Sequence, residues 1–234
     1  TRFKCDWSSD VCSSDLDIIT YVSQGYATRP TGPVPTAMWG SLKEPMYNHD
    51  LDKAKALLAE AGYPNGGFDM KITYISGVED RKKTAELYKS ELEKLGINVE
   101  IIGMPWDQMW EKAKSTNPED RQDWLSIAWW PDVVTPASWF KALYMTEESI
   151  VFNLGYYSNP ELDRIIKEAD VYCATDRDKA AELYQEAGRI VSEDAVSTFV
   201  TDGKSIYTIR KNLKNFGEDP AYPYVLFFYD FYRE

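Results

Sequence analysis

Hydrophobic positions in the middle of the chain recur first with the period of a helix. Between Leu51 and Ala61 an apolar residue appears at every third or fourth position, which predicts an amphipathic helix with one face in a core. Asp50 stands where an N-cap residue is preferred, and Gly62 stands where a left-handed residue commonly ends a helix. The pattern therefore predicts a helix whose two ends are both defined by local sequence.

The period then changes to that of a strand. Every second residue from 68 to 74 is apolar, which predicts a half-buried β-strand. A leucine-rich helix follows and ends at Gly96, and residues 97–101 alternate again. Strand, helix and strand at this spacing predict a βαβ crossover with parallel pairing.

The second half of the chain predicts further helices, one more central strand and a β-rich end. Residues 124–130 are almost continuously apolar, which predicts a strand buried on both faces. Residues 197–201 and 205–210 favour strands and precede an aromatic tail. Helices are expected at 106–113, at 160–169 behind the cap Asn159, and at 176–190. This order predicts an α/β fold with a mixed, partly parallel sheet flanked by helices.

Composition and charge exclude several classes of protein. The apolar share of 44% and the aromatic share of 14% are too high for a disordered chain. The net charge of −12, without a Lys/Arg-rich stripe, argues against a nucleic-acid partner because phosphates would be repelled. No apolar run reaches the roughly 18 residues that cross a bilayer, so no membrane insertion is expected.

Residues 1–16 are set aside from the fold. They repeat Ser-Ser-Asp around Val11-Cys12 without a helical or strand period, as translated adaptor sequence or a linker would. They also lack the pattern of a signal peptide, so the targeting signal is expected to lie outside this sequence. Without Cys5 and Cys12, Cys173 has neither a disulfide partner nor Cys/His companions at metal-ligand spacing. Neither a metal nor a cofactor is expected.

Several segments follow one another in a recognisable order. They are Asp50 to Phe68 (DLDKAKALLAEAGYPNGGF), Leu92 to Ile101 (LEKLGINVEI), Trp130 to Pro136 (WPDVVTP), Tyr156 to Asp163 (YYSNPELD) and Ala181 to Val191 (AELYQEAGRIV). In this order and spacing they resemble the family 5 extracytoplasmic solute-binding proteins, the peptide-binding components of ABC importers. The resemblance covers nearly everything after residue 17.

The resemblance implies the C-terminal half of a protein in which two lobes close over a ligand. Residues 17–46 would cross from a mostly missing first lobe, 47–200 would form a periplasmic-binding-protein-like second lobe, and 201–234 would return to the first. It further implies a monomer, periplasmic or at the cell surface, that delivers its ligand to a membrane ABC permease.

The segment around Trp129 to Asp132 is the expected ligand-binding site. In open α/β sheets, ligands bind beyond the carboxyl ends of strands, and this segment follows the third expected strand. The resemblance implies that the backbone of Ala128, Trp129 and Trp130 hydrogen-bonds a peptide main chain, and that Asp132 pairs with the ligand's α-ammonium group. Alternatively, Asp132 caps a helix starting near Pro136 or merely ends the strand, and each tryptophan packs in a core.

Two ligand classes and one enzyme class remain open. A peptide or oligopeptide is the first ligand expected, and an oligosaccharide stacked on Trp129 or Trp130 is the second. A glycan hydrolase would need a second carboxylate about 5 to 9.5 Å from Asp132. His49, the only histidine, has no accompanying nucleophile motif, and Gly66-Gly67 lacks the pattern of a phosphate loop. A binding protein without catalytic residues is therefore the prediction.

Overall fold

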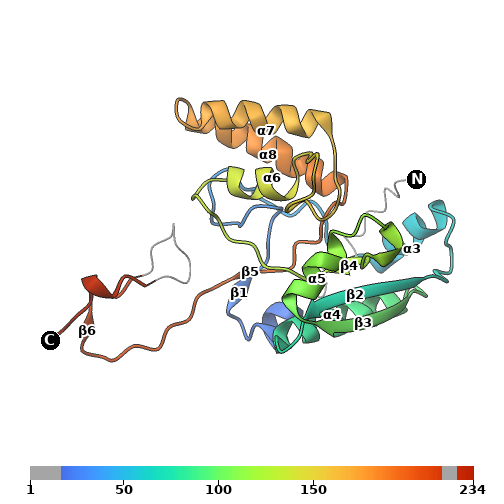
Figure 1. The fold of residues 1–234 in the computed structure, drawn as a ribbon, viewed down its shortest axis with the longest axis horizontal. Helices are drawn as coiled ribbons and strands as arrows, with labels where there is room; N and C mark the ends of the chain where they lie inside the picture. The colour runs from blue at the N-terminus through green and yellow to red at the C-terminus, as the bar shows by residue number, and fades with distance from the viewer. Residues whose placement is uncertain (1–16, 218–225) are drawn as a thin grey trace.

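The computed structural model describes residues 17–217 and 226–234. The expectations for residues 1–16 and for residues 218–225 of the C-terminal segment lie outside this part. Figure 1 shows an α/β layer, with its sheet and helices, and a layer of helices stacked beside it. Each layer has its own hydrophobic core. Residues from the expected crossing segment contribute to both, since Ile18 and Val22 belong to the first core and Val34 to the second.

The α/β layer is built on a three-stranded parallel sheet in the order β3-β2-β4. The central strand β2 (Asp69–Ile75) pairs along its whole length with β3 (Asn98–Met104). The connecting helix α4 (Glu79–Glu93) buries Tyr88 and Leu92 in the core of this layer. The expected βαβ crossover with parallel strands is thus confirmed.

Short helices surround this sheet. The helix α3 (Leu51–Glu60) begins at Asp50, whose side chain accepts hydrogen bonds from the backbone N–H groups of Asp52 and Lys53, as expected for an N-cap. The remaining elements are the π-helical turn η2 (Ile18–Val22), the helix α5 (Trp106–Ala113) and the 3-10 turn η3 (Pro118–Asp120).

Three helices form the second layer: α6 (Ala137–Leu143), α7 (Pro160–Tyr172) and α8 (Arg177–Glu193). The long helices α7 and α8 lie side by side (Figure 1), and their facing residues are almost completely buried. The ring of Phe140 from α6 stacks on Tyr184 from α8, with centroids 5.6 Å apart. This stack joins α6 to the helical pair.

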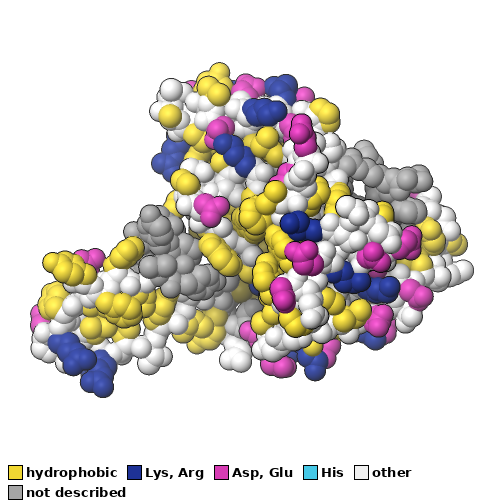
Figure 2. Space-filling model, in the orientation of Figure 1, with side chains coloured by type: hydrophobic (Ala, Val, Ile, Leu, Met, Phe, Trp, Pro, Cys, Tyr) yellow, Lys and Arg dark blue, Asp and Glu magenta, His cyan; other side chains and the backbone are white. Residues whose placement is uncertain are grey.

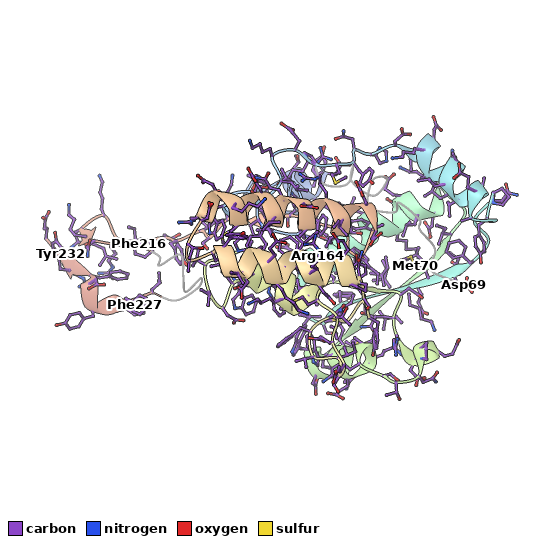
Figure 3. The ribbon with its side chains drawn as sticks, turned by 90° about the horizontal axis from the view of Figure 1, so that it is seen from above. Asp69, Met70, Arg164, Phe216, Phe227 and Tyr232 are labelled. Carbon is purple, nitrogen blue, oxygen red and sulfur yellow. The ribbon has the colours of Figure 1, made fainter. Side chains whose placement is uncertain are left out.

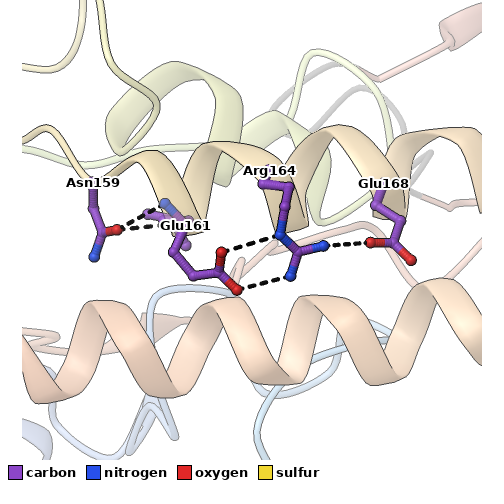
Figure 4. Close-up of polar contacts among 5 residues, drawn as sticks. Asn159, Glu161, Arg164 and Glu168 are labelled. Carbon is purple, nitrogen blue, oxygen red and sulfur yellow. Dashed lines mark hydrogen bonds and ion pairs between the residues drawn. The ribbon is translucent and has the colours of Figure 1, made fainter.

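The start of α7 follows the sequence signals closely. Asn159 caps it by accepting from the backbone N–H groups of Glu161 and Leu162, and Pro160 is the first helical residue (Figure 4). Arg164 donates to the carboxylates of Glu161 and Glu168, one turn away on either side. The hydrogen bond from Arg164 lowers the pKa of Glu161. Because these groups lie on the surface, the pairs contribute little to stability.

Two pairs of very short strands complete the chain. β1 (Ala27–Thr28) pairs antiparallel with β5 (Asp202–Gly203). Beyond β5 the chain forms a C-terminal arm, residues 204–217 and 226–234, that runs away from both layers (Figures 1 and 3). At its end β6 (Leu213–Lys214) pairs with β7 (Tyr232–Arg233), next to the 3-10 turn η4 (Phe228–Asp230). Several of its aromatic side chains are exposed, Tyr229 almost fully.

Of the expected strands, one is shorter than predicted and two are not strands. The strand expected at 124–130 is only β4 (Trp124–Leu125), and both residues are half-buried rather than buried. The last hydrogen bond of this segment to the sheet runs from Ser126 N–H to Thr73 O, and the chain then leaves the sheet. Residues 197–201 and 205–210 are not strands, because the described residues offer them no ladder partner; only Asp202–Gly203 between them pairs.

The close packing around Gly96 allows a prediction about the stability of the protein. Gly96 has φ +78°, and a Cβ atom there would lie 2.2 Å from the carbonyl oxygen of Asn65. Gly96→Ala is therefore expected to lower the free energy of unfolding by about 3 kcal/mol, combining backbone strain with overpacking. Gly62→Ala is the matched control, since Gly62 has φ +93° but open space around it; about 1 kcal/mol is expected. Equal losses in denaturant titrations would contradict the steric argument.

Candidate ligand-binding site

A cleft of about 1210 Å³ lies between the two cores. Phe68 and Tyr88 line it from the α/β layer, and Trp139 and Tyr144 line it from the helical layer. Residues 121–131 and 195–203 pass along it. Hydrophobic side chains gather along the middle of the face in Figure 2, between the two layers. A cleft with apolar walls and a few polar groups is the usual form of a ligand site.

Three of the four expected site residues line this cleft. They are Ala128, Trp129 and Trp130. Trp129 is half-buried, whereas Trp130 is 54% exposed, so the two rings are unequally available to a ligand. Asp132 follows the lining residue Pro131, but it is exposed and is not part of the wall itself. The structure thus places the expected residues together, with the carboxylate outside the wall.

A short backbone segment just beyond β4 lines the cleft without hydrogen bonds to the described part of the chain. Ser126 N–H makes the last bond to the sheet. Within the described part of the chain, the backbone N–H and C=O groups of Ile127, Ala128 and Trp129 have no hydrogen-bond partner. Such groups are normally paired when buried, so an open row of them in a cleft is available to water or to a ligand's main chain.

The turn after Trp130 is hydrogen-bonded to the first turn of α6. Ser138 Oγ donates to the carbonyl of Val133 at 2.6 Å and accepts from its N–H at 3.1 Å. Trp129 Nε1 donates to the backbone carbonyl of Ser138 at 3.1 Å. The alternative in which Asp132 caps this helix is wrong: the cap position is Pro136, which has no side-chain hydrogen bond, and Ser138 organises the turn instead.

A row of aromatic rings continues from the cleft along the surface, and the sequence did not predict it. Phe152 contacts Trp129 edge to face, with centroids 5.2 Å apart, and Trp110 at 5.8 Å. Trp110 in turn lies 4.9 Å from Trp106. Trp106 and Phe152 are 45% and 41% exposed. The only sequence signal was the spacing of the two tryptophans on one face of the expected helix 106–113.

The loop that carries Phe152 is held by two polar side chains. The carboxylate of Glu147 accepts from the N–H groups of Val151, Phe152 and Asn153 at 2.7 to 3.3 Å. Asn153 is fully buried, and its side chain makes three hydrogen bonds, one with Met145 O and two with the backbone groups of Tyr157. These bonds fix the loop backbone, so Phe152 is presented against Trp129 in a defined position.

Residues 197–201 form another part of the cleft wall. The side chain of Ser197 hydrogen-bonds Tyr144, the C-cap residue of α6. Burial raises the pKa of Tyr144 to about 12, and the bond with Ser197 offsets part of the rise. Tyr144 therefore stays protonated at neutral pH and acts as a neutral polar group of the wall.

The other candidate chemical groups lie apart from these features. His49 Nε2 lies 3.6 Å from Glu91 Oε2 on α4. Cys173 is half-buried after α7, with Sγ 3.4 Å from Tyr184 Oη. In residues 17–217 and 226–234, no cluster of three His, Cys, Asp or Glu side chains could hold a metal ion. Among the helices of those same residues, none is both long and apolar enough to cross a membrane.

Comparison with solved structures defines the class of protein. The ABC transporter-associated periplasmic binding protein DppA from Helicobacter pylori, solved in complex with peptide STSA, superposes on 86% of this chain with a TM-score of 0.71 and 25% identity. The match covers 37% of that chain. The chain thus has the fold of periplasmic binding proteins, which confirms the expected fold class.

The sequence also identifies the family. Residues 16–149, more than half of the chain, match the family described as Bacterial extracellular solute-binding proteins, family 5 Middle. The chain belongs to this family, as the resemblance implied.

Two curated relatives align with most of this chain. One is the glutathione-binding protein GsiB of Pectobacterium atrosepticum, 27% identical over 85% of this chain and 39% of its own length. The other is heme-binding protein A of Haemophilus influenzae, 28% identical over 87% of this chain and 37% of its own length. The chain therefore spans about two-fifths of the relatives that it matches.

Proposed function

We propose that this protein captures a peptide in the cleft for import by an ABC transporter. The observation that carries the proposal is the open backbone of Ile127, Ala128 and Trp129, which lines the cleft and makes no hydrogen bond to residues 17–217 or 226–234. A peptide main chain carries matching donors and acceptors at strand spacing, so it can pair with this segment whatever its side chains. A relative named for glutathione and a solved structure with a bound peptide support this class of ligand.

In this proposal the side chains around the open backbone have different roles in binding. Trp129 is fixed by its bond to Ser138 and forms part of the wall, while the exposed ring of Trp130 contacts ligand side chains. Asp132 pairs with the ligand's α-ammonium group from the rim beside Pro131. A charge-assisted hydrogen bond of this kind contributes about 1.5 to 3 kcal/mol. The protein acts by binding alone, without a catalytic residue or a cofactor.

The remaining expectations belong to the same proposal. A first lobe closes over the cleft, and the C-terminal arm returns to it, which would cover the exposed rings of Phe228, Tyr229 and Tyr232. The closed monomer then docks on an ABC permease outside the cytoplasm. Residues 47–200, which contribute to both layers, form the second lobe in this proposal.

Calorimetric titration of the full-length gene product tests the ligand class. We expect binding to members of a library of short peptides and none to a panel of oligosaccharides. For a bound peptide, N-acetylation should weaken binding about ten- to hundredfold, which corresponds to loss of one charge-assisted hydrogen bond. In Asp132→Asn this difference should largely disappear, whereas Asp178→Asn, an equal charge change on the exposed start of α8, should keep it.

Two results would contradict the proposal at different levels. Binding of oligosaccharides but of no peptide would reject the ligand class. Unchanged discrimination against acetylated peptides in Asp132→Asn would leave the ligand class in place and reject the role of Asp132.

A further inference from the structure

The aromatic row, which consists of Trp106, Trp110, Phe152 and Trp129, carries two exposed rings. Trp106 and Phe152 are 45% and 41% exposed, and both contact Trp110, which is half-buried. Phe152 also contacts Trp129, which belongs to the segment with the open backbone. The row therefore extends the apolar wall of the cleft with ring surface that the described part of the chain leaves uncovered.

The row lies at the edge of the sheet where ligands bind in open α/β folds. β3 and β4 both run parallel to β2, so the carboxyl ends of the three strands lie at one edge. Trp106 is the first residue of α5, just after β3, and Trp129 follows β4. Phe152 lines the cleft. Since ligands bind beyond the carboxyl ends of such strands, the row lies beside the expected ligand.

The two segments that carry the exposed rings are held against each other. The hydroxyl of Tyr156, on the loop of Phe152, donates to the carbonyls of Ala113 and Ser115 at the end of α5, both 3.2 Å away. Arg121 Nε donates to the same carbonyl of Ser115 at 2.7 Å, and its guanidinium carbon lies 3.5 Å from the ring centroid of Tyr156. The rings are therefore preorganised, and little conformational freedom remains to be lost when a ligand binds.

The chemistry of the row suits an aromatic group. The contacts of Phe152 with Trp110 and Trp129 are edge to face, an arrangement that aromatic pairs prefer and that contributes beyond the burial of apolar area. The indole N–H of Trp129 already donates to the carbonyl of Ser138. A further ring packed against Phe152 and Trp106 would continue the same pattern of contacts and cover their exposed surface.

We infer that the aromatic row selects an aromatic side chain of the captured peptide. The inference rests on the proposed function, because a peptide main chain paired with residues 127–129 brings ligand side chains to the row. Side chains of an extended peptide point alternately to opposite sides, so those of one side can reach the rings beside Trp129. The row thus gives a binding mode that tolerates many side chains a preference at one ligand position.

The test uses a peptide that the full-length gene product binds, with phenylalanine, cyclohexylalanine or alanine placed at each position in turn. Cyclohexylalanine has nearly the same size and is at least as apolar, but it lacks the π system. By calorimetry we expect one position at which phenylalanine binds about three- to tenfold more tightly than cyclohexylalanine. At that position phenylalanine should bind at least about tenfold more tightly than alanine.

Variants of the row assign this preference to its rings. Phe152→Leu and Trp106→Leu keep apolar volume without the ring, so each should lower the ratio of phenylalanine to cyclohexylalanine affinity. The double variant should bring this ratio to about one while affinity for the alanine peptide changes by less than about twofold. Phe152→Tyr keeps the ring and should keep the ratio. Tyr63→Leu is the matched control, because Tyr63 is 37% exposed and pairs edge to face with Phe68 outside the row.

Four results would overturn the inference. They are equal affinity for phenylalanine and cyclohexylalanine at every position, equally tight binding of lysine at the preferred position, an unchanged ratio in the double variant, and an equal fall of the ratio in Tyr63→Leu. A double variant that loses affinity for the alanine and phenylalanine peptides by the same factor would also overturn it, because the rings would then support the fold alone. Failure of the wild-type protein to bind any peptide would overturn the proposed function itself, which is a separate result.

Discussion

Phe140→Ala is expected to lower the free energy of unfolding by about 4 kcal/mol, the largest effect of any single change considered. Phe140 is completely buried and stacks on Tyr184 at 5.6 Å with an interplanar angle of 9°. The substitution removes this contact between α6 and α8 and leaves a cavity that surrounding helices cannot fill. Unfolding in denaturant, followed by circular dichroism, gives the measurement.

The matched control is Phe228→Ala in the C-terminal arm. Phe228 is 74% exposed, so its truncation should change the free energy of unfolding by about 0.5 kcal/mol or less. If the two variants lose equal stability, the helical layer does not form the core described here.

Asn153→Ala is expected to cost about 3 kcal/mol of stability. The change leaves two carbonyls, of Met145 and Tyr157, and the N–H group of Tyr157 without partners in a fully buried site. Each unsatisfied buried group costs about 1 to 3 kcal/mol, reduced where water can enter. The same change should loosen the loop that presents Phe152 and Tyr156, so peptide affinity should fall as well.

Asn98→Ala provides the comparison for this prediction. Asn98 also donates a side-chain hydrogen bond, to Asp69 at 2.8 Å, but it does so at the surface. We expect a loss of about 0.5 kcal/mol, because water replaces the partner. A loss at position 153 no larger than that at position 98 would show that the buried hydrogen bonds do not hold the loop.

The elements that sequence predicted well are those whose signals act within a few residues. Asp50 and Asn159 satisfy N–H groups of the following turn, and the alternating pattern of β2 appears in the burial of residues 69–72, although Thr73 on the opposite face is buried as well. Caps and periods of this kind are local, so they can be identified without knowing the fold. The parallel pairing of β2 with β3 followed from the length of the connection.

The elements that sequence missed depend on distant partners. Residues 124–130 have the composition of a buried strand, yet the chain leaves the sheet after Ser126, because Trp129 is held by Ser138 of α6. The contacts of Phe152 with Trp110 and Trp129 likewise join three separate segments. Neither strand propensity nor spacing contains such information.

The candidate site likewise combines residues that local sequence indicates with contacts that depend on distant partners. A topological rule and a family resemblance led to Ala128, Trp129 and Trp130 as expected site residues. They line the cleft, and their role in binding a ligand stays a prediction. The stacking of Arg121 on Tyr156 brings together positions 35 residues apart (156 − 121 = 35), and nothing in either local sequence indicates it. The position of the Arg121 charge therefore depends on the fold, whereas the segment 128–130 could be singled out from the sequence.

Amide hydrogen exchange of residues 124–131 tests most directly whether this backbone binds the ligand. In the full-length gene product saturated with a bound peptide, the N–H groups of Ile127, Ala128 and Trp129 should exchange more slowly than in the free protein, because they would donate to the ligand. Exchange in the buried face of α8 should not change. A peptide that saturates the protein without slowing exchange at these three residues would contradict the account.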